Sequence, residues 1–153
     1  MSVTHADFTL ERTYRHSRER AFNAFADPAL KEQWFANPGG WANAQWELDF
    51  RVGGSEMSSG GAPGGRFNEF RSTYHDIVEN ERIVYSYDLF HDHQLISVSL
   101  TTIEFMATSD GSKVTFTEQG AFFDDPAAPG QREHGTGVLL DMFGSFLEGQ
   151  EVR

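Results

Sequence analysis

The stretch SRERAFNAFADPALKEQW, residues 17–34, decides the fold, because it predicts two short helices in immediate succession. Ser17 suits the N-cap of the first helix, since a serine oxygen can accept a hydrogen bond from the free N–H groups of the first turn. Asp27 and Pro28 start a second helix, because aspartate caps a helix and proline is preorganised for its first position. Two short helices directly after a first strand leave few folds to choose from.

Strands are predicted on both sides of this helical stretch. Before it, Phe8, Leu10 and Tyr14 alternate with polar residues, which is the pattern of a half-buried strand. Arg12 shares their phase, so it is either buried and paired or reaches solvent at the end of the sheet. After the helices, alternating patterns predict strands over residues 45–51, 70–76, 83–89, 95–108 and 114–122.

Two irregularities are predicted within the sheet. Residues 58–65 contain four glycines and one proline, and this composition predicts a hairpin loop. The apolar phase changes between Leu100 and Ile103, so we expect a β-bulge near Thr101 and Thr102 that flips the faces of the strand. A bulge at that point would curve the sheet.

A helix over residues 131–147 is predicted to cover the sheet. Its apolar side consists of Leu139, Met142, Phe143 and Phe146. Glycines at 135, 137 and 144 either permit a close approach or leave space above the sheet. The element order therefore predicts an α+β fold with a curved antiparallel sheet of about six to seven strands, because short turns join successive strands.

The composition excludes several classes of function. The 153 residues fit one domain, residues 1–153. A net charge of −11 argues against nucleic acid and anionic membranes as partners. The chain has no cysteine, so disulfides and thiolate metal sites are absent. A polar N-terminus without a signal peptide, and no apolar run of about 18 residues, predict a cytoplasmic protein without membrane contact.

Three motifs in the expected order resemble one known family. Arg12 followed by residues 20–28 and Trp34 resembles its opening, residues 49–54 (DFRVGG) resemble its glycine-paired strand, and residues 74–87 (YHDIVENERIVYSY) resemble its central hairpin. The chain is similar over residues 8–147 to the family named for homologues of the activator of the 90-kDa heat-shock-protein ATPase. That family belongs to the START-like helix-grip superfamily, also called SRPBCC. The resemblance implies a helix-grip fold.

The chain departs from the family at one position. Members often carry a Gly-Trp pair early in the last helix, where this chain has Gly137 and Val138. The smaller residue would enlarge the cavity or shift its mouth, so no ligand identity is transferred.

A cavity between the sheet and the last helix is the predicted ligand-binding site, because aromatic side chains with a few polar groups are typical of small-molecule pockets. The residues expected to line it are Trp41, Trp46, Phe70, Tyr74, Tyr85, Tyr87, Phe105, Phe116, Glu118, Val138, Met142 and Phe146. Glu118 is in phase with Val114 and Phe116, which points it to the covered face. It is either satisfied there by a neighbour such as Tyr85, poised for a polar ligand group, or able to reach solvent at the strand end.

Other chemistry-bearing residues are assigned to the surface. We expect His91, Asp92 and His93 to form a solvated hairpin tip rather than a metal site, because no further ligand motif follows. Asp124 and Asp125 precede a proline and indicate a loop. His134 and Asp141 are expected to form a surface pair on the last helix.

The predicted function is binding of a hydrophobic, aromatic or lipid-like small molecule, without metal, cofactor or catalytic residue. One alternative is a co-chaperone-like interaction module or stress-response factor, whose acidic surface would dock on a basic chaperone. A cyclase- or dehydratase-type enzyme is a further alternative, but it requires a second acid/base group beside Glu118. Exposed strand edges would also allow a homodimer.

Overall fold

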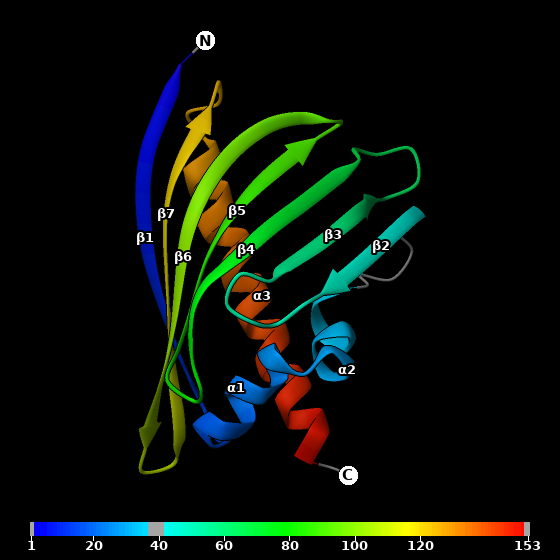
Figure 1. The fold of residues 1–153 in the computed structure, drawn as a ribbon. Coiled ribbons are helices and arrows are strands. Elements are labelled where there is room, and N and C mark those ends of the chain that lie inside the picture. Colours follow the sequence, from blue (N-terminus) through cyan, green and yellow to red (C-terminus); the bar gives the residue numbers. More distant parts are fainter. Residues whose placement is uncertain (1, 37–41, 152–153) are drawn as a thin grey trace.

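The computed structural model describes residues 2–36 and 42–151 and shows a curved antiparallel sheet crossed by one long helix (Figure 1). Within these residues the strands are β1 (Val3–Tyr14), β2 (Ala42–Leu48), β3 (Ser55–Gly61), β4 (Asn68–Val78), β5 (Arg82–His91), β6 (Gln94–Thr108) and β7 (Gly111–Phe123). Their order across the sheet is β1-β7-β6-β5-β4-β3-β2, so β1 and β2 form its edges. This is the helix-grip architecture that the sequence predicts.

The first two helices begin where their capping residues predict, whereas the last helix begins at Ala128, three residues before its expected start. They are α1 (Arg18–Ala26), α2 (Pro28–Lys31), the π-helical turn η1 (Glu32–Ala36) and α3 (Ala128–Glu151). Ser17 Oγ accepts a hydrogen bond from the Arg20 N–H at 3.2 Å, and Asp27 Oδ1 accepts one from the Ala29 N–H at 2.9 Å. Both bonds satisfy N–H groups that the first turn of a helix leaves free. None of the described helices is long and apolar enough to cross a membrane.

An aromatic core fills one end of the space between α3 and the sheet. The ring of Phe143 on α3 lies 4.8 Å from Phe25 and 4.9 Å from Trp34, measured between ring centroids. Phe25 in turn contacts Phe105 of β6 at 5.7 Å. Trp34 Nε1 donates to the Ala24 carbonyl at 2.9 Å, which ties η1 to α1. The helical stretch 17–34 therefore closes the end of the molecule where the C-terminal half of α3 lies (Figure 1).

The buried face of α3 is rotated from the expected one. Its buried residues follow the spacing i, i+4, i+7 and i+11: Thr136, Leu140, Phe143 and Leu147. Leu139 and Phe146 flank this face and are half-buried. Met142 is 46% exposed and does not belong to it. The error arises because neighbouring apolar residues 139–140 and 142–143 fit two overlapping stripes, and only packing selects one of them.

Two glycines of α3 show opposite uses of a missing side chain. A Cβ at Gly144 would lie 2.8 Å from Cε1 of Tyr14, so glycine permits a close contact with β1. The same contact lets the Tyr14 hydroxyl donate to the Leu140 carbonyl at 2.8 Å. A Cβ at Gly135 would meet no atom within 4 Å. The helix α3 is thus tightly packed against β1 at Gly144 and leaves space at Gly135.

The loop predicted over residues 58–65 is wrong for its first half. Strand β3 continues to Gly61, and Ser58 pairs with Phe70 on one side and Trp46 on the other. Glycine and serine have low strand propensity, but neighbouring strands override it because they supply the backbone partners. The small side chain of Ser58 also leaves room for the large side chains of Trp46 and Phe70 on the neighbouring strands.

The predicted bulge near Thr101 and Thr102 is also wrong, because β6 and β7 pair without interruption from Ser97 to Thr108. The irregularity lies earlier: Leu89 pairs with Ser97 and Phe90 with Leu95, which leaves Ile96 as the extra residue. Ile103 is buried as expected, but Val98 and Leu100 point outward, since each is 40% exposed. The inward residues before Ile103 are polar, namely Ser97, Ser99 and Thr101.

Candidate functional site

A cavity of about 680 Å³ lies between the sheet and the N-terminal half of α3. Its volume falls within the range of about 300–1,000 Å³ that is typical of small-molecule sites. Buried side chains from β5, β7 and α3 form part of its wall: Tyr87, Phe116, Glu118 and Thr136. Exposed residues of the β5–β6 turn and of the region around the start of α3 complete the lining, so the cavity has a rim that solvent reaches.

Glu118 is the buried acidic group in the wall of this cavity, and only 1% of it is exposed, whereas Asp92 and Asp125 belong to the exposed rim. Its Oε2 accepts hydrogen bonds from the Tyr87 hydroxyl at 2.7 Å and from the Ser99 hydroxyl at 2.7 Å. Arg132 Nη1 also donates to Oε2, at 3.1 Å. A buried carboxylate is tolerated only when it is paired and hydrogen-bonded, and this one is both.

Arg132 connects the first turns of α3 to the sheet. In addition to Glu118, its Nη1 donates to the Tyr87 hydroxyl at 2.8 Å, and its Nη2 donates to the Ser97 hydroxyl at 2.8 Å. The guanidinium lies 5.1 Å from the ring centroid of Phe122. Arginine stays protonated in proteins, so Arg132 cannot act as a proton-transfer partner for Glu118. We refer to Tyr87, Ser97, Ser99, Glu118 and Arg132 as the Glu118 cluster.

The tyrosines of the cavity are held in their neutral form. Burial, followed by the neighbouring Glu118 carboxylate, raises the pKa of Tyr87. Burial, followed by Tyr87 and Glu118, raises the pKa of Tyr85 well above its usual value. Loss of a proton would place a second negative charge beside Glu118 in a poorly solvated region. Both hydroxyls therefore remain hydrogen-bond donors across the physiological pH range.

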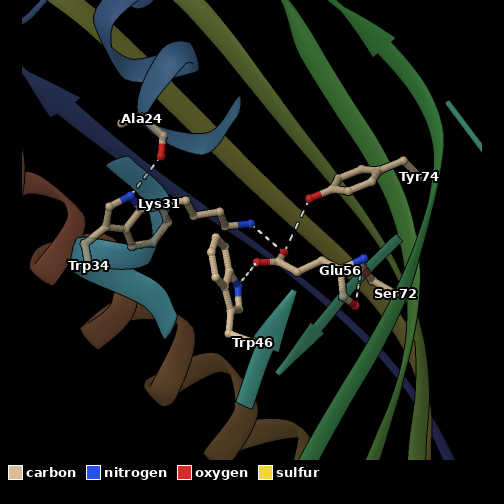
Figure 2. Close-up of polar contacts among 7 residues, drawn as sticks. All are labelled: Ala24, Lys31, Trp34, Trp46, Glu56, Ser72 and Tyr74. Carbon is tan, nitrogen blue, oxygen red and sulfur yellow. Dashed lines mark hydrogen bonds and ion pairs between the residues drawn. The ribbon is translucent and has the colours of Figure 1, made fainter. Parts of the chain in front are cut away.

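A second buried ion pair lies between α2 and β3, outside the cavity wall (Figure 2). Lys31 Nζ lies 2.6 Å from Glu56 Oε1, and the Tyr74 hydroxyl donates to the same oxygen at 3.3 Å. Trp46 Nε1 donates to Glu56 Oε2 at 2.9 Å, so both carboxylate oxygens have partners. Ser72 Oγ bonds the backbone of Glu56. We refer to Lys31, Trp46, Glu56, Ser72 and Tyr74 as the Glu56 cluster.

The rim of the cavity carries a histidine held in its neutral form. Nδ1 of His91 lies 2.8 Å from Arg66 Nη1, and Nδ1 can accept from this arginine only if it carries no proton. Burial lowers the pKa of His91, and the positive charges of Arg66 and Arg132 lower it further. The side chain therefore adds no positive charge to the rim near neutral pH.

The structure brings together part of the residue set expected in the cavity. Those that line it are Phe70, Tyr85, Tyr87, Phe116 and Glu118. Trp46 and Tyr74 lie instead in the Glu56 cluster, and Phe105 packs in the aromatic core against Phe22 and Phe25. Trp41 lies outside the described residues.

Three expected lining residues of α3 do not face the cavity. Val138 and Met142 are each 46% exposed, because the helix turns them away from the sheet. Phe146 packs against the aromatic core at the closed end of the molecule. The expected effect of Val138 on the cavity is therefore wrong; Ala128 and Gly135 are small residues of α3 that line it.

The structure selects one of the alternatives that the sequence left open for Glu118, in which a neighbouring tyrosine satisfies the buried carboxylate. The carboxylate is buried on the covered face, and the alternative in which it reaches solvent is excluded. Its tyrosine partner is Tyr87 rather than Tyr85. Arg12, whose environment was left open, is partly exposed and paired, since its Nε donates to Asp141 at 3.0 Å.

The remaining candidates lie on the surface. Asp92 and His93 form the turn between β5 and β6, where both adopt positive φ angles. Asp125 Oδ1 accepts from the Ala127 N–H at 2.9 Å in the loop before α3. Asp141 pairs with Arg12, so the expected pair with His134 is wrong. Among the described residues, no group of three or more His, Asp or Glu side chains could hold a metal ion.

Sequence reasoning missed the two cations and one of the carboxylates. Arg132 carries a signal, because it lies four residues before Thr136 and therefore on the buried face of α3. For Lys31 and Glu56 we identify no sequence pattern that predicts their burial. Lys31 is in a four-residue helix too short to show a periodic face, and Glu56 precedes a glycine- and serine-rich stretch.

A curved antiparallel sheet, a long helix gripping it and a cavity between them define a protein of the START-like helix-grip class. The family model "Activator of Hsp90 ATPase homolog 1-like protein" matches residues 15–148, and the chain belongs to this family. The family fold commonly forms a ligand-binding or co-chaperone-type module.

Solved structures support the assignment. A protein from Rhizobium loti is 43% identical, with a TM-score of 0.87 over 95% of this chain and 99% of the other. An uncharacterised protein from Rhizobium leguminosarum is 40% identical, with a TM-score of 0.90 over 96% of this chain and 97% of the other. An AHSA1-like protein from Aeromonas hydrophila shares the fold at 19% identity, with a TM-score of 0.71 over 97% and 96% of the two chains. No curated protein matches the sequence.

Proposed function

We propose that this protein binds a hydrophobic or aromatic small molecule in the cavity between α3 and the sheet. The observation that carries the proposal is the combination of an apolar wall with one concentrated group of polar side chains. Phe70 and Phe116 belong to the apolar wall, and Glu118 and Arg132 belong to the polar group. Pockets of this composition bury the apolar body of a ligand and orient it through a few polar contacts.

The N-terminal half of α3 supports the proposal, because it holds the cavity open. Gly135 lines the cavity and leaves space where any other residue would project a side chain. Arg132, one turn earlier, holds this half of the helix to the sheet through Glu118 and Ser97. An anchored helix can preserve a cavity that would otherwise collapse, since empty apolar space is unfavourable.

A fluorescence titration with the neutral dye N-phenyl-1-naphthylamine tests the proposal. We expect saturable binding at one dye per chain in the native protein. Gly135→Phe should abolish it, because the ring would occupy the cavity. Gly149→Phe is the matched control: the same substitution in the same helix, at a position where a Cβ also meets nothing within 4 Å, and away from the cavity lining.

Equal dye binding by the two variants would contradict the proposal, because it would place the dye elsewhere on the protein. A thermal melt of each variant shows whether loss of binding reflects loss of the fold. The alternative role as a co-chaperone-type module rests on the family description and on the net charge of −11. It predicts that capture of a chaperone depends on salt and not on residue 135.

A further inference from the structure

A row of three polar groups without hydrogen-bond partners among the described residues crosses the sheet, and two of the three line the cavity. Tyr85, Thr101 and Glu118 are aligned across three strands, since Tyr85 pairs with Thr101 in the β5–β6 register and Thr101 pairs with Glu118 in the β6–β7 register. All three belong to the inward face of the sheet. Their side chains therefore lie side by side across β5, β6 and β7.

The Glu118 carboxylate uses only one of its two oxygens. Tyr87, Ser99 and Arg132 all donate to Oε2. No hydrogen bond from any residue of the described chain reaches Oε1, although Glu118 lines the cavity. A carboxylate oxygen can accept at least two hydrogen bonds, so Oε1 offers an acceptor to whatever occupies the cavity.

The two neighbours in the row show the same deficit. Thr101 is fully buried, and its hydroxyl has no partner within the part of the chain that the structure describes. The Tyr85 hydroxyl makes no hydrogen bond to the described residues either, and Tyr85 lines the cavity. Buried polar groups in folded proteins nearly always find partners. Tyr85 and Glu118 line the cavity, so a ligand there can supply the partner that each of them lacks.

The charge at this end of the cavity selects a neutral ligand group. Arg132 lies 3.1 Å from Glu118, so the pair is close to electrically neutral as a unit. Beside this pair, a cationic group would approach Arg132 and an anionic group would approach Glu118. The other charged lining residues, Arg66, Asp92 and Asp125, belong to the exposed rim. A charged ligand group would lose its hydration there and gain no unpaired opposite charge of the Glu118–Arg132 pair in return. An uncharged donor avoids both costs.

We infer that the ligand is an uncharged aromatic molecule bearing a hydroxyl group that donates its hydrogen bond to Glu118 Oε1. This inference rests on the proposed function, because it specifies the chemistry of the same cavity. The aromatic body would contact Phe70 and Phe116, which line the same space. Glu118 is then the residue that determines specificity, and Arg132 is the positioning residue that orients its carboxylate.

A series of four naphthalenes separates the donor from the charge. The probes are 2-naphthol, 2-methoxynaphthalene, 2-naphthoate and 2-naphthylmethylammonium, and calorimetry at neutral pH gives the dissociation constant of each. We expect 2-naphthol to bind about tenfold more tightly than 2-methoxynaphthalene, because a hydrogen bond to a charged acceptor is worth at least that ratio. The two charged probes should bind more weakly than 2-naphthol.

Glu118→Gln tests the assigned atom. The three donors around Oε2 require the amide carbonyl at that position, so the amide NH2 takes the place of Oε1 and presents a donor to the cavity. The preference for 2-naphthol over 2-methoxynaphthalene should fall to about one. Glu104→Gln, an exposed glutamate on the outer face of β6, is the matched control and should keep the native ratio.

Each outcome bears on the inference. Equal binding of 2-naphthol and 2-methoxynaphthalene by the native protein overturns it while leaving the proposed function intact. A native ratio that persists in folded Glu118→Gln overturns the assignment to Oε1. Failure of every naphthalene and of N-phenyl-1-naphthylamine to bind overturns both proposals. The native ratio needs no variant, so the test stands even if Glu118→Gln does not fold.

Discussion

The Glu56 cluster and the Glu118 cluster are both buried ion pairs with tyrosine and serine partners, but they differ in completeness. In the Glu56 cluster both carboxylate oxygens have partners, at Lys31, Tyr74 and Trp46 (Figure 2). In the Glu118 cluster three donors share one oxygen, and the other faces a cavity.

This difference separates a structural contact from a binding site. A buried pair with every oxygen satisfied holds two elements together and has no capacity for a ligand. The Glu56 cluster accordingly joins α2 to β3, where Lys31 also lies 4.7 Å from the ring centroid of Phe35. A pair with an unused acceptor beside empty space can bind something else. Burial of charge alone would not distinguish the two.

The largest effect is expected from breaking the Glu56 cluster. Lys31→Met leaves the Glu56 carboxylate, which is 2% exposed, without its cation, and should lower the free energy of unfolding by about 3–5 kcal/mol. Urea denaturation measures the loss. Adding Glu56→Gln to Lys31→Met should recover most of it, because the second change removes the unpaired charge. If Lys31→Met alone were as stable as the native protein, the ion pair would contribute nothing to the free energy of unfolding.

Breaking the Glu118 cluster should cost less. Arg132→Met leaves Tyr87 and Ser99 as donors to Glu118, and the side chain of Arg132 is more exposed than that of Lys31, at 14% against 6%. We expect the free energy of unfolding to fall by about 1–3 kcal/mol, which is the range for losing a hydrogen bond to a charged group. The same denaturation series provides the comparison with Lys31→Met. Equal losses for the two variants would remove the distinction between the clusters.

The two halves of α3 should respond with opposite signs to one substitution. Gly135→Ala should raise the free energy of unfolding by about 0.5–1 kcal/mol, because alanine favours the helix and its Cβ meets nothing. Gly144→Ala should lower it by about 1–2 kcal/mol, because its Cβ would collide with Tyr14 and disturb the bond to Leu140. Thermal melts of both variants test the contrast, which two changes of the same sign would refute.

The smallest effect is expected at Tyr85. Its hydroxyl has no hydrogen bond to the described residues, so Tyr85→Phe should change the free energy of unfolding by less than about 0.5 kcal/mol. Tyr87→Phe is the control, because it removes the 2.7 Å bond to Glu118 and should cost about 1–2 kcal/mol. Equal costs in urea denaturation would mean that the Tyr85 hydroxyl has a partner after all.

Much of the fold follows from local patterns in the sequence. Ser17 and Asp27 cap the helices where expected, because capping depends on a side chain and the N–H groups two or three residues later. The alternation of Val114, Phe116, Glu118 and Phe122 placed these side chains on the covered face of β7, because strand geometry fixes a period of two. Motifs over most of the chain also indicated the family.

Local patterns failed where neighbouring elements decided the outcome. Val98 and Leu100 appeared to mark the inner face of β6, whereas the inner residues are Ser97, Ser99 and Thr101. Hydroxyls are tolerated inside because Arg132 and Glu118, distant in sequence, bond Ser97 and Ser99. The face of α3 was similarly ambiguous until Tyr14 and the aromatic core selected Leu140 and Phe143 over Met142.

Local sequence patterns were enough for the order of elements apart from β3, for the capping of the first two helices, for the family and for the inward phase of Glu118. These depend on period, on side-chain type and on neighbours a few residues away. Only the tertiary structure decided which cation pairs with which carboxylate, because Lys31 and Glu56 meet across 25 positions and Arg132 reaches Ser97 across 35. Whether a buried carboxylate is complete or has a free oxygen depends on such distant partners, and no local pattern encodes them.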